Sequence, residues 1–196
     1  MNLAHRWLCS SNSWRTVVDK LIPWALDRLE LGTDVLEIGS GPGITTARLR
    51  TLVPDLICLE IDERYASALS RRMARERVRV LCGDGTALPL RDASFDAVVC
   101  FTMLHHVRSS ELQDRLLAEA ARVLRPAGVF AGVDSLAGCV FRLLHLFDTL
   151  VPVDPATFAP RLVAAGFENV RVDIVPHRFR FRGYKPGNAL PRCAGR

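Results

Sequence analysis

The sequence predicts an α/β fold built on a doubly wound parallel sheet with helices on both faces. Strand-like and helix-like patterns alternate along nearly the whole chain, which is typical of this class. The first strand-like run, residues 35–38, leads into a loop with glycine at 39, 41 and 43 and then into a helical pattern. In open α/β sheets, ligands bind at such a junction between a strand and a helix. The length of 196 residues fits a single domain over residues 1–196.

The N-terminal segment, residues 1–33, is predicted to be largely helical. Its apolar residues recur at helical spacing, and they are Trp14, Val17, Val18, Leu21, Ile22 and Leu26. Pro23 should kink or split this helix, because it has no N–H to donate and its ring obstructs the preceding turn. Residues 32–34, Gly-Thr-Asp, should close the segment and lead into the first strand.

The other elements follow in order. Strands are expected at residues 56–61, 78–82, 95–101, 129–133, 170–175 and 178–184, and helices at 45–52, 63–77, 112–124, 139–150 and 155–165. Pro126 and Gly128 should stop the helix over 112–124, and the helix over 139–150 is a candidate lid. In the last strand Phe179 and Phe181 alternate with arginines, so one face should be buried. Residues 186–196 read as a loose tail.

Composition sets limits on location and on redox chemistry. Hydrophobic residues make up 49% of the chain, yet no apolar run reaches the ~20 residues of a membrane span. The N-terminus has no signal-peptide core, so a cytoplasmic location is the expectation. The 6 cysteines form no C-x-x-C pair, which argues against a zinc knuckle or a redox motif. Cys58, Cys82 and Cys100 fall in or beside strands and are expected to be buried apolar residues.

The charge of the chain is basic, with a net charge of +5 and a pI of about 9.1. Many cations crowd the C-terminus, namely Arg171, Arg178, Arg180, Arg182, Lys185, Arg192 and Arg196. A solvated edge is the simplest interpretation, and an anionic substrate or a nucleic acid are the alternatives. Aromatic residues are only 7% of the chain, which disfavours nucleic acid because few rings are present to stack on bases.

The glycine loop distinguishes between two kinds of cofactor. The dinucleotide fingerprint G-x-G-x-x-G needs a third glycine where this chain has Ile44. Glu37 directs an acid toward the loop, which suits a ligand with an ammonium group and suits a pyrophosphate poorly. The stretch Val-Leu-Glu-Ile-Gly-Ser-Gly-Pro-Gly at 35–43 resembles the glycine motif of class I S-adenosylmethionine-dependent methyltransferases. That resemblance, which extends over residues 34–184, implies a seven-stranded sheet with the last strand antiparallel.

Two further motifs supply the expected cofactor contacts. An acid about 20 residues past the glycine loop can hold both ribose hydroxyls, and Glu60 and Asp62 compete for this role. The resemblance assigns the ribose to Glu60 and packing against adenine to Ile61, which leaves Asp62 to cap the next helix. It also implies that Asp84 accepts a hydrogen bond from the adenine amino group, with Gly85 or Thr86 offering a backbone N–H.

The remaining cofactor residues come from the glycine loop and the fourth strand. The loop contributes Glu37, Gly39, Ser40, Gly41 and Gly43 to the expected site. The end of the fourth strand should lend a backbone carbonyl, from Cys100 or Phe101, to the cofactor ammonium. Asp96, at the start of that strand, is expected to be structural.

A general base is needed only where the methyl acceptor must lose a proton. His105 and His106 follow the fourth strand and should lie at the mouth of the cleft, so they are the candidate catalytic residues, with His105 ahead. Asp134 ends the fifth strand and is a further candidate, and His145 and His177 are weaker ones. No acid follows the fourth strand directly, unlike in the divalent-metal catechol-type enzymes, so no metal is expected.

The sequence therefore predicts a methyltransferase that moves a methyl group from S-adenosylmethionine to an oxygen or nitrogen of a small molecule, leaving S-adenosylhomocysteine. Residues 1–33, the two histidines and residues 139–150 should shape the acceptor pocket, with Trp7, Trp14 and Trp24 as possible lining. Adenine-amino and cytosine carbon-5 enzymes are disfavoured, because neither the Asn/Asp-Pro-Pro-aromatic segment nor the Pro-Cys pair is present. The alternatives are an RNA or protein methyltransferase using the basic C-terminus and a non-catalytic cofactor-binding accessory protein.

Overall fold

The computed structural model describes residues 11–146 and 148–187. A seven-stranded sheet runs through them in the order β3-β2-β1-β4-β5-β7-β6. Its strands are β1 (Asp34–Ile38), β2 (Asp55–Glu60), β3 (Val78–Cys82), β4 (Phe95–Phe101), β5 (Leu124–Ser135), β6 (Glu168–Val175) and β7 (Arg178–Tyr184). Only β7 runs antiparallel to its neighbours, β5 and β6. The predicted doubly wound sheet with an antiparallel last strand is confirmed.

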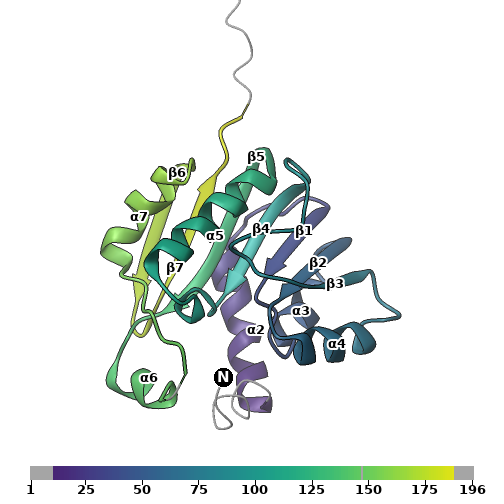
Figure 1. Ribbon diagram of the computed structural model, residues 1–196, viewed down its shortest axis with the longest axis horizontal. Helices are drawn as coiled ribbons and strands as arrows, with labels where there is room; N and C mark the ends of the chain where they lie inside the picture. Colours follow the sequence, from purple (N-terminus) through teal and green to yellow (C-terminus); the bar gives the residue numbers. More distant parts are fainter. Residues whose placement is uncertain (1–10, 147, 188–196) are drawn as a thin grey trace, which may run out of the picture.

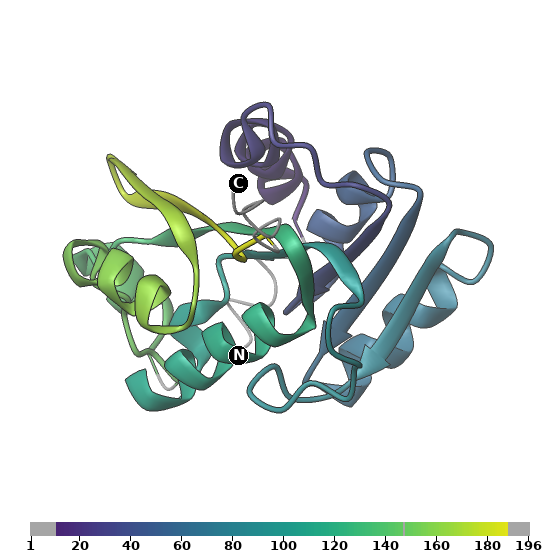
Figure 2. The same cartoon turned by 90° about the horizontal axis from the view of Figure 1, so that it is seen from above.

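Helices cover both faces of this sheet (Figures 1 and 2). They are α2 (Asn12–Leu26), α3 (Ile44–Leu49), α4 (Glu63–Arg72), α5 (Ser110–Val123), α6 (Cys139–Leu144) and α7 (Pro155–Ala164), with a 3-10 turn η1 at Leu104–His106. One apolar core joins α2, α3 and α4 to the sheet, and a second core joins α5 and α7 to the opposite face. Figure 2 shows α2 and α5 on opposite sides of the strands.

Strand positions agree closely with the sequence pattern in the central strands β1 and β4, where the buried runs are nearly continuous. In β1 the four residues from Val35 to Ile38 are all at most 1% exposed, as expected for a parallel strand covered on both faces. Phe179 and Phe181 of β7 are buried, so the predicted alternation in the last strand is also confirmed.

Helix boundaries differ more from the prediction. α2 continues through Pro23 without splitting, since the proline lies in the last turn, where few backbone bonds follow it. α4 ends at Arg72 rather than at residue 77, and α6 ends at Leu144 rather than at 150. α5 stops before Leu124, and β5 already begins there, so Pro126 and Gly128 lie within the strand instead of ending the helix.

Two predictions on individual residues need comment. Cys58 and Cys100 are buried as expected, but Cys82 is exposed, because β3 is the edge strand of the sheet. Trp7 and the tail from residue 188 lie outside the described residues. No described helix is long and apolar enough to cross a membrane.

Candidate functional site

A cavity of about 460 Å³ opens beyond the carboxyl ends of β1, β2 and β4. One wall consists of the glycine loop and the end of β2, and the opposite wall consists of the residues that follow β4, together with α6. Trp14 of α2 also lines it. In Figure 1 the first turns of α2 and the short α6 lie at this end of the sheet. The volume falls within the range of small-ligand sites.

The glycine loop reaches this cavity because its backbone turns through left-handed conformations. Gly39 has φ +76°, and a Cβ added to it would meet Met103 at 2.9 Å. Gly41 has φ +50°, and a Cβ there would have no atom within 4 Å, so the space beside it is open. Ser40 is buried and lines the cavity, and its Oγ has no hydrogen-bond partner among the described residues. A loop with an open glycine and an unsatisfied hydroxyl fits a polar ligand.

Glu60 ties the end of β2 to this loop. Its Oε2 accepts the N–H of Gly41 at 2.6 Å, and its Oε1 accepts the N–H of Asp62 at 3.0 Å. Burial raises the pKa of Glu60, although these backbone hydrogen bonds act in the opposite direction. Each carboxylate oxygen keeps a second acceptor position, and Glu60 lines the cavity. The arrangement suits the ribose role expected of Glu60.

Ile61 and Asp62, which follow Glu60, both line the cavity. Ile61 lines the cavity and is 66% exposed, which is high for an isoleucine and leaves its side chain available to a flat ring. The Asp62 carboxylate accepts the N–H groups of Arg64 and Tyr65, so it caps α4 as predicted.

Glu37 lies beneath the loop rather than in the cavity. It is 1% exposed, and its carboxylate accepts hydrogen bonds from the hydroxyls of Thr45 and Thr46 and from the Cys58 thiol. Burial raises its pKa, and the threonine bonds oppose that rise. The lining of the cavity does not include Glu37. It therefore fixes the start of α3 to β1, and this role was not foreseen from the sequence.

The segment after β3 also lies apart from the cavity lining. Asp84 is exposed, and its Oδ1 accepts the N–H of Thr86, which closes a local turn. Neither of these residues lines the cavity, and nor does Gly85. Phe101 lines it, whereas Cys100 is buried behind it. The adenine role expected of Asp84 thus depends on a ligand extending past the described cavity.

Three histidines meet on the wall opposite the glycine loop. One ring nitrogen of each of His105, His106 and His145 lies within 4.8 Å of the others, and all three residues line the cavity. Phe141 packs against His105 and His145, with ring centroids 4.9 and 4.2 Å away. The sequence pointed to His105 and His106 but ranked His145 lower, because nothing in the spacing shows that α6 folds back over η1.

Asp134 holds His105 in place. Its Oδ1 lies 2.5 Å from His105 Nδ1, and its Oδ2 accepts the His105 backbone N–H at 3.0 Å. Asp134 is fully buried and His105 is 2% exposed. Because the carboxylate binds Nδ1, the ring presents its Nε2 away from Asp134. Asp134 is absent from the cavity lining, so it positions His105 and does not face a ligand.

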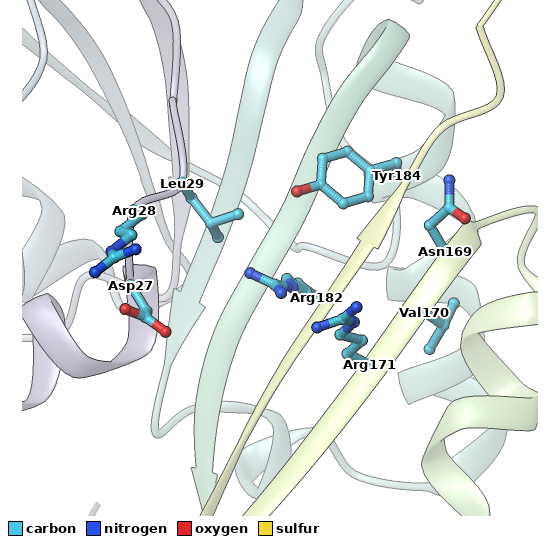
Figure 3. Close-up of a pocket in the computed structure, with 8 residues that line it drawn as sticks. All are labelled: Asp27, Arg28, Leu29, Asn169, Val170, Arg171, Arg182 and Tyr184. Carbon is cyan, nitrogen blue, oxygen red and sulfur yellow. The ribbon is translucent and has the colours of Figure 1, made fainter.

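A second hollow of about 620 Å³ lies at the opposite end of the sheet (Figure 3). Its lining comes from residues 27–29, which follow α2, and from β6 and β7, and it includes the cations Arg28, Arg171 and Arg182. Figure 3 shows Arg171 and Arg182 side by side, with Asp27 and Arg28 across from them.

Two further basic residues of the C-terminal region, Arg180 and Lys185, are engaged within the fold. Arg180 bonds to Asp27, Asp173 and the Trp24 carbonyl, and Lys185 bonds to the carbonyls of Arg122 and Leu124. These two cations are therefore not part of a free basic surface.

Comparison with known proteins shows that the chain is similar to methyltransferases. A family model described as a methyltransferase domain matches residues 36–132. A probable S-adenosylmethionine-dependent methyltransferase of Mycolicibacterium smegmatis is 38% identical over 99 residues, which are 50% of this chain and 37% of that protein. An uncharacterized methyltransferase of Mycobacterium tuberculosis is 30% identical over 118 residues, which are 60% of this chain and 55% of that protein.

Comparison with solved structures identifies the same fold in a methyltransferase. A putative methyltransferase solved in complex with the Trm112 methyltransferase activator of Haloferax volcanii superposes with a TM-score of 0.74 at 17% identity. That alignment covers 95% of this chain and 99% of the other. The chain spans between about a third and about half of the length of the two mycobacterial relatives.

Proposed function

The chain belongs to the class I S-adenosylmethionine-dependent methyltransferases, and from this premise we propose that it transfers a methyl group to an oxygen or nitrogen of a small molecule. The observation that carries the proposal is the 2.6 Å bond between Gly41 and Glu60. It joins the two cofactor motifs, 19 residues apart, into one wall of the cavity. S-adenosylmethionine supplies a methyl group on a sulfonium, which is an activated leaving group.

The residues of this wall would hold the cofactor by its polar and flat parts. Glu60 would accept the ribose hydroxyls on its free acceptor positions, and Ile61 would pack against the adenine. Ser40, whose Oγ has no partner among the described residues, and the open space beside Gly41 would face the amino-acid portion. The Glu60 carboxylate is fixed by backbone hydrogen bonds before a ligand arrives, so little of its ordering entropy is lost on binding.

The opposite wall would receive the acceptor. His105 Nε2 would take the proton of an acceptor hydroxyl or ammonium, while Asp134 stabilises the protonated ring that results. Trp14, Met103 and Phe141 give this side an apolar lining that excludes water, and this favours methyl transfer over hydrolysis. Of the described part of residues 1–33, Trp14 lines the cavity, and it supports the role of this segment in the acceptor pocket. Trp24 instead packs against Arg180, whose Cζ lies 5.2 Å from the centre of its ring.

A calorimetric titration tests the cofactor assignment. Wild type should bind S-adenosylhomocysteine, and Glu60→Gln should weaken binding at least tenfold, which is a loss of about 1.4 kcal/mol. Asp55→Asn is the matched control, because Asp55 is an exposed acid at the other end of the same strand. Equal affinity of wild type and Glu60→Gln would refute the assignment of Glu60. Formation of S-adenosylhomocysteine in an acceptor screen then separates an enzyme from a cofactor-binding accessory protein.

A further inference from the structure

The three histidines that line the cavity, His105, His106 and His145, share a second property besides their proximity. Each has its Nδ1 at a hydrogen-bond acceptor: His105 at the Asp134 carboxylate, His106 at the Thr149 carbonyl at 3.3 Å, and His145 at the Phe141 carbonyl at 2.7 Å. A carboxylate or a carbonyl oxygen can only accept, so Nδ1 carries the proton in each ring. In a neutral imidazole, Nε2 then holds the lone pair.

This pattern is the one that protein metal sites use. A histidine that binds a metal through one nitrogen usually donates the other N–H to a carboxylate or a backbone carbonyl, and that contact fixes the tautomer and the ring orientation. Here one carboxylate and two carbonyls do this for three rings whose nitrogens already lie within 4.8 Å of one another.

We propose that His105, His106 and His145 bind a divalent transition-metal ion, Zn²⁺ in the first instance, through their Nε2 atoms. Three imidazoles without thiolates or further carboxylates suit Zn²⁺ and its neighbours rather than Mg²⁺ or Ca²⁺. Zinc–nitrogen bonds of about 2.0–2.1 Å place tetrahedral ligand atoms about 3.3 Å apart. One nitrogen of each ring now lies within 4.8 Å of the others, so the ligand atoms approach one another when the ion binds.

The position of the cluster leaves a coordination site facing the cavity. All three histidines line it together with Phe141 and Thr149, and α6 brings His145 over η1. Val151 donates its N–H to the His105 carbonyl at 2.8 Å, so the segment after α6 is fastened at the same place. An ion held by three protein ligands with a fourth position open has the form of a catalytic rather than a structural zinc site.

Such an ion would define the acceptor more narrowly than the proposed function does. A hydroxyl bound at the open position would lose its proton to solvent, because the ion lowers its pKa as it lowers that of bound water. His105 would then act as a ligand, and the ion would replace it in activating the acceptor. This last step rests on the proposed function, but metal binding itself does not.

The test is a titration of the metal-free full chain with Co²⁺ and with Zn²⁺. Cobalt reports coordination by its visible absorption, and competition with Zn²⁺ gives the zinc affinity. We expect one ion per chain, bound at micromolar concentration or tighter. His106→Gln and His145→Gln should each weaken binding at least tenfold and change the cobalt spectrum. His177→Asn is the matched control, since His177 is an exposed histidine on the β6–β7 turn with φ +71°, a conformation that asparagine tolerates.

The outcomes separate this inference from the proposed function. No saturable binding by wild type, or equal losses in His145→Gln and His177→Asn, would overturn the metal site. S-adenosylhomocysteine binding by the same variants shows that they are folded, because its expected contacts include neither His106 nor His145. Wild type that binds zinc but not S-adenosylhomocysteine would refute the cofactor assignment and leave the metal site standing.

Discussion

The two ends of the parallel strands each carry a hollow, of about 460 Å³ at the carboxyl end and about 620 Å³ at the amino end. They differ in how their polar groups are held. At the carboxyl end, Glu60 and His105 are at most 7% exposed and are fixed by hydrogen bonds to backbone and to Asp134. At the amino end, the cations Arg171 and Arg182 lie on long side chains from the last two strands.

Convergence and burial of polar groups, rather than volume, therefore distinguish the candidate ligand site at the carboxyl end. Buried polar groups fixed before binding lose little entropy when a ligand arrives, whereas flexible surface arginines must be ordered by it. The amino end has its own fixed network, but that network holds the chain to itself. Asp96 accepts the N–H groups of Thr33 and Asp34 and pairs with Arg125 at 2.5 Å.

The largest effect on stability and on cofactor binding is expected from glycine-to-alanine substitutions, one at each end of the parallel strands. Gly39→Ala and Gly166→Ala both force a positive φ on alanine, at a cost of about 1–3 kcal/mol. A Cβ on Gly39 also meets Met103 at 2.9 Å, whereas one on Gly166 meets nothing within 4 Å. Gly39→Ala should therefore lose a further 1–3 kcal/mol or so of unfolding free energy and weaken S-adenosylhomocysteine binding at least tenfold.

Chemical denaturation and calorimetry of these two variants check this prediction. Gly166→Ala, as the matched control, should bind S-adenosylhomocysteine like wild type. If Gly39→Ala bound it within a factor of two of wild type, the glycine loop would not be a wall of the cofactor site.

The second effect is a loss of stability, expected when the hydrogen-bond network of Asp96 at the amino end of the strands is disrupted. Burial works against ionisation of Asp96, but hydrogen bonds from Asp34, Arg125 and Thr33 outweigh it and hold its pKa at about 2. A lowered pKa stabilises the fold above the ordinary value of 3.8, and this contribution is lost as pH falls through about 2. Asp96→Asn should lower the unfolding free energy at pH 7 by about 1–2 kcal/mol and leave cofactor affinity unchanged.

Urea unfolding at several pH values measures this. The gap between wild type and Asp96→Asn should shrink as pH falls from 5 toward 2. Asp92→Asn serves as the control, because its carboxylate is 76% exposed although it pairs with Arg122, and it should change stability by less than about 0.5 kcal/mol. A gap that stays constant with pH would show that Asp96 acts through its shape and not through its charge.

The sequence revealed the carboxyl end better than the amino end because its signals are local. The glycine spacing and the acid at residue 60 are readable in short stretches, and both positions lie on the cavity. Side-chain burial and the path of a connecting segment were harder to predict. Glu37 was expected in the cofactor site, but its burial directs it to Thr45 and Thr46, and His145 joins the acceptor wall only through the path of α6.

The boundaries of helices and strands likewise were predicted well where the signal is local and poorly where it depends on the fold. All five residues of β3 and all seven of β4 were predicted to the residue, because short, largely apolar runs between turn signals mark strands. The start of β5 was missed by five residues, because Pro126 suggested a turn where the chain already pairs with β4 at Leu124. Pairing of that kind is set by the neighbouring strand and leaves no trace in the local pattern.

A smaller effect is expected from pH on cofactor affinity. Burial raises the pKa of Glu60 above its ordinary value, so this carboxyl takes up its proton earlier on acidification than an exposed glutamate does. The ionised form accepts hydrogen bonds from hydroxyls more strongly. The affinity of wild type for S-adenosylhomocysteine should therefore fall a few-fold as pH drops from 7.5 toward that raised pKa.

Glu60→Gln, which cannot ionise, should show a flatter pH profile over the same range, at a weaker affinity throughout. Parallel profiles for the two proteins would assign the pH dependence to another group. The experiment thus asks whether the charge of Glu60, and not only its shape, belongs to the ligand site at the carboxyl end.

The smallest effect, and the one that most sharply tests the comparison, concerns the arginines of the amino end. Removing both Arg171 and Arg182 should change S-adenosylhomocysteine affinity by less than a factor of two, since neither lines the cavity at the carboxyl end.

Wild type should bind a single-stranded RNA oligonucleotide weakly, with an anisotropy signal that depends little on salt. Arg180 and Lys185 are engaged inside the fold, so few described cations of this region remain to contact phosphates. If instead wild type showed a steep salt dependence that flattened by about two in the double variant, two phosphate contacts would map to this hollow. The amino end would then be a binding surface in its own right, and an RNA acceptor would replace the small molecule in the proposed reaction.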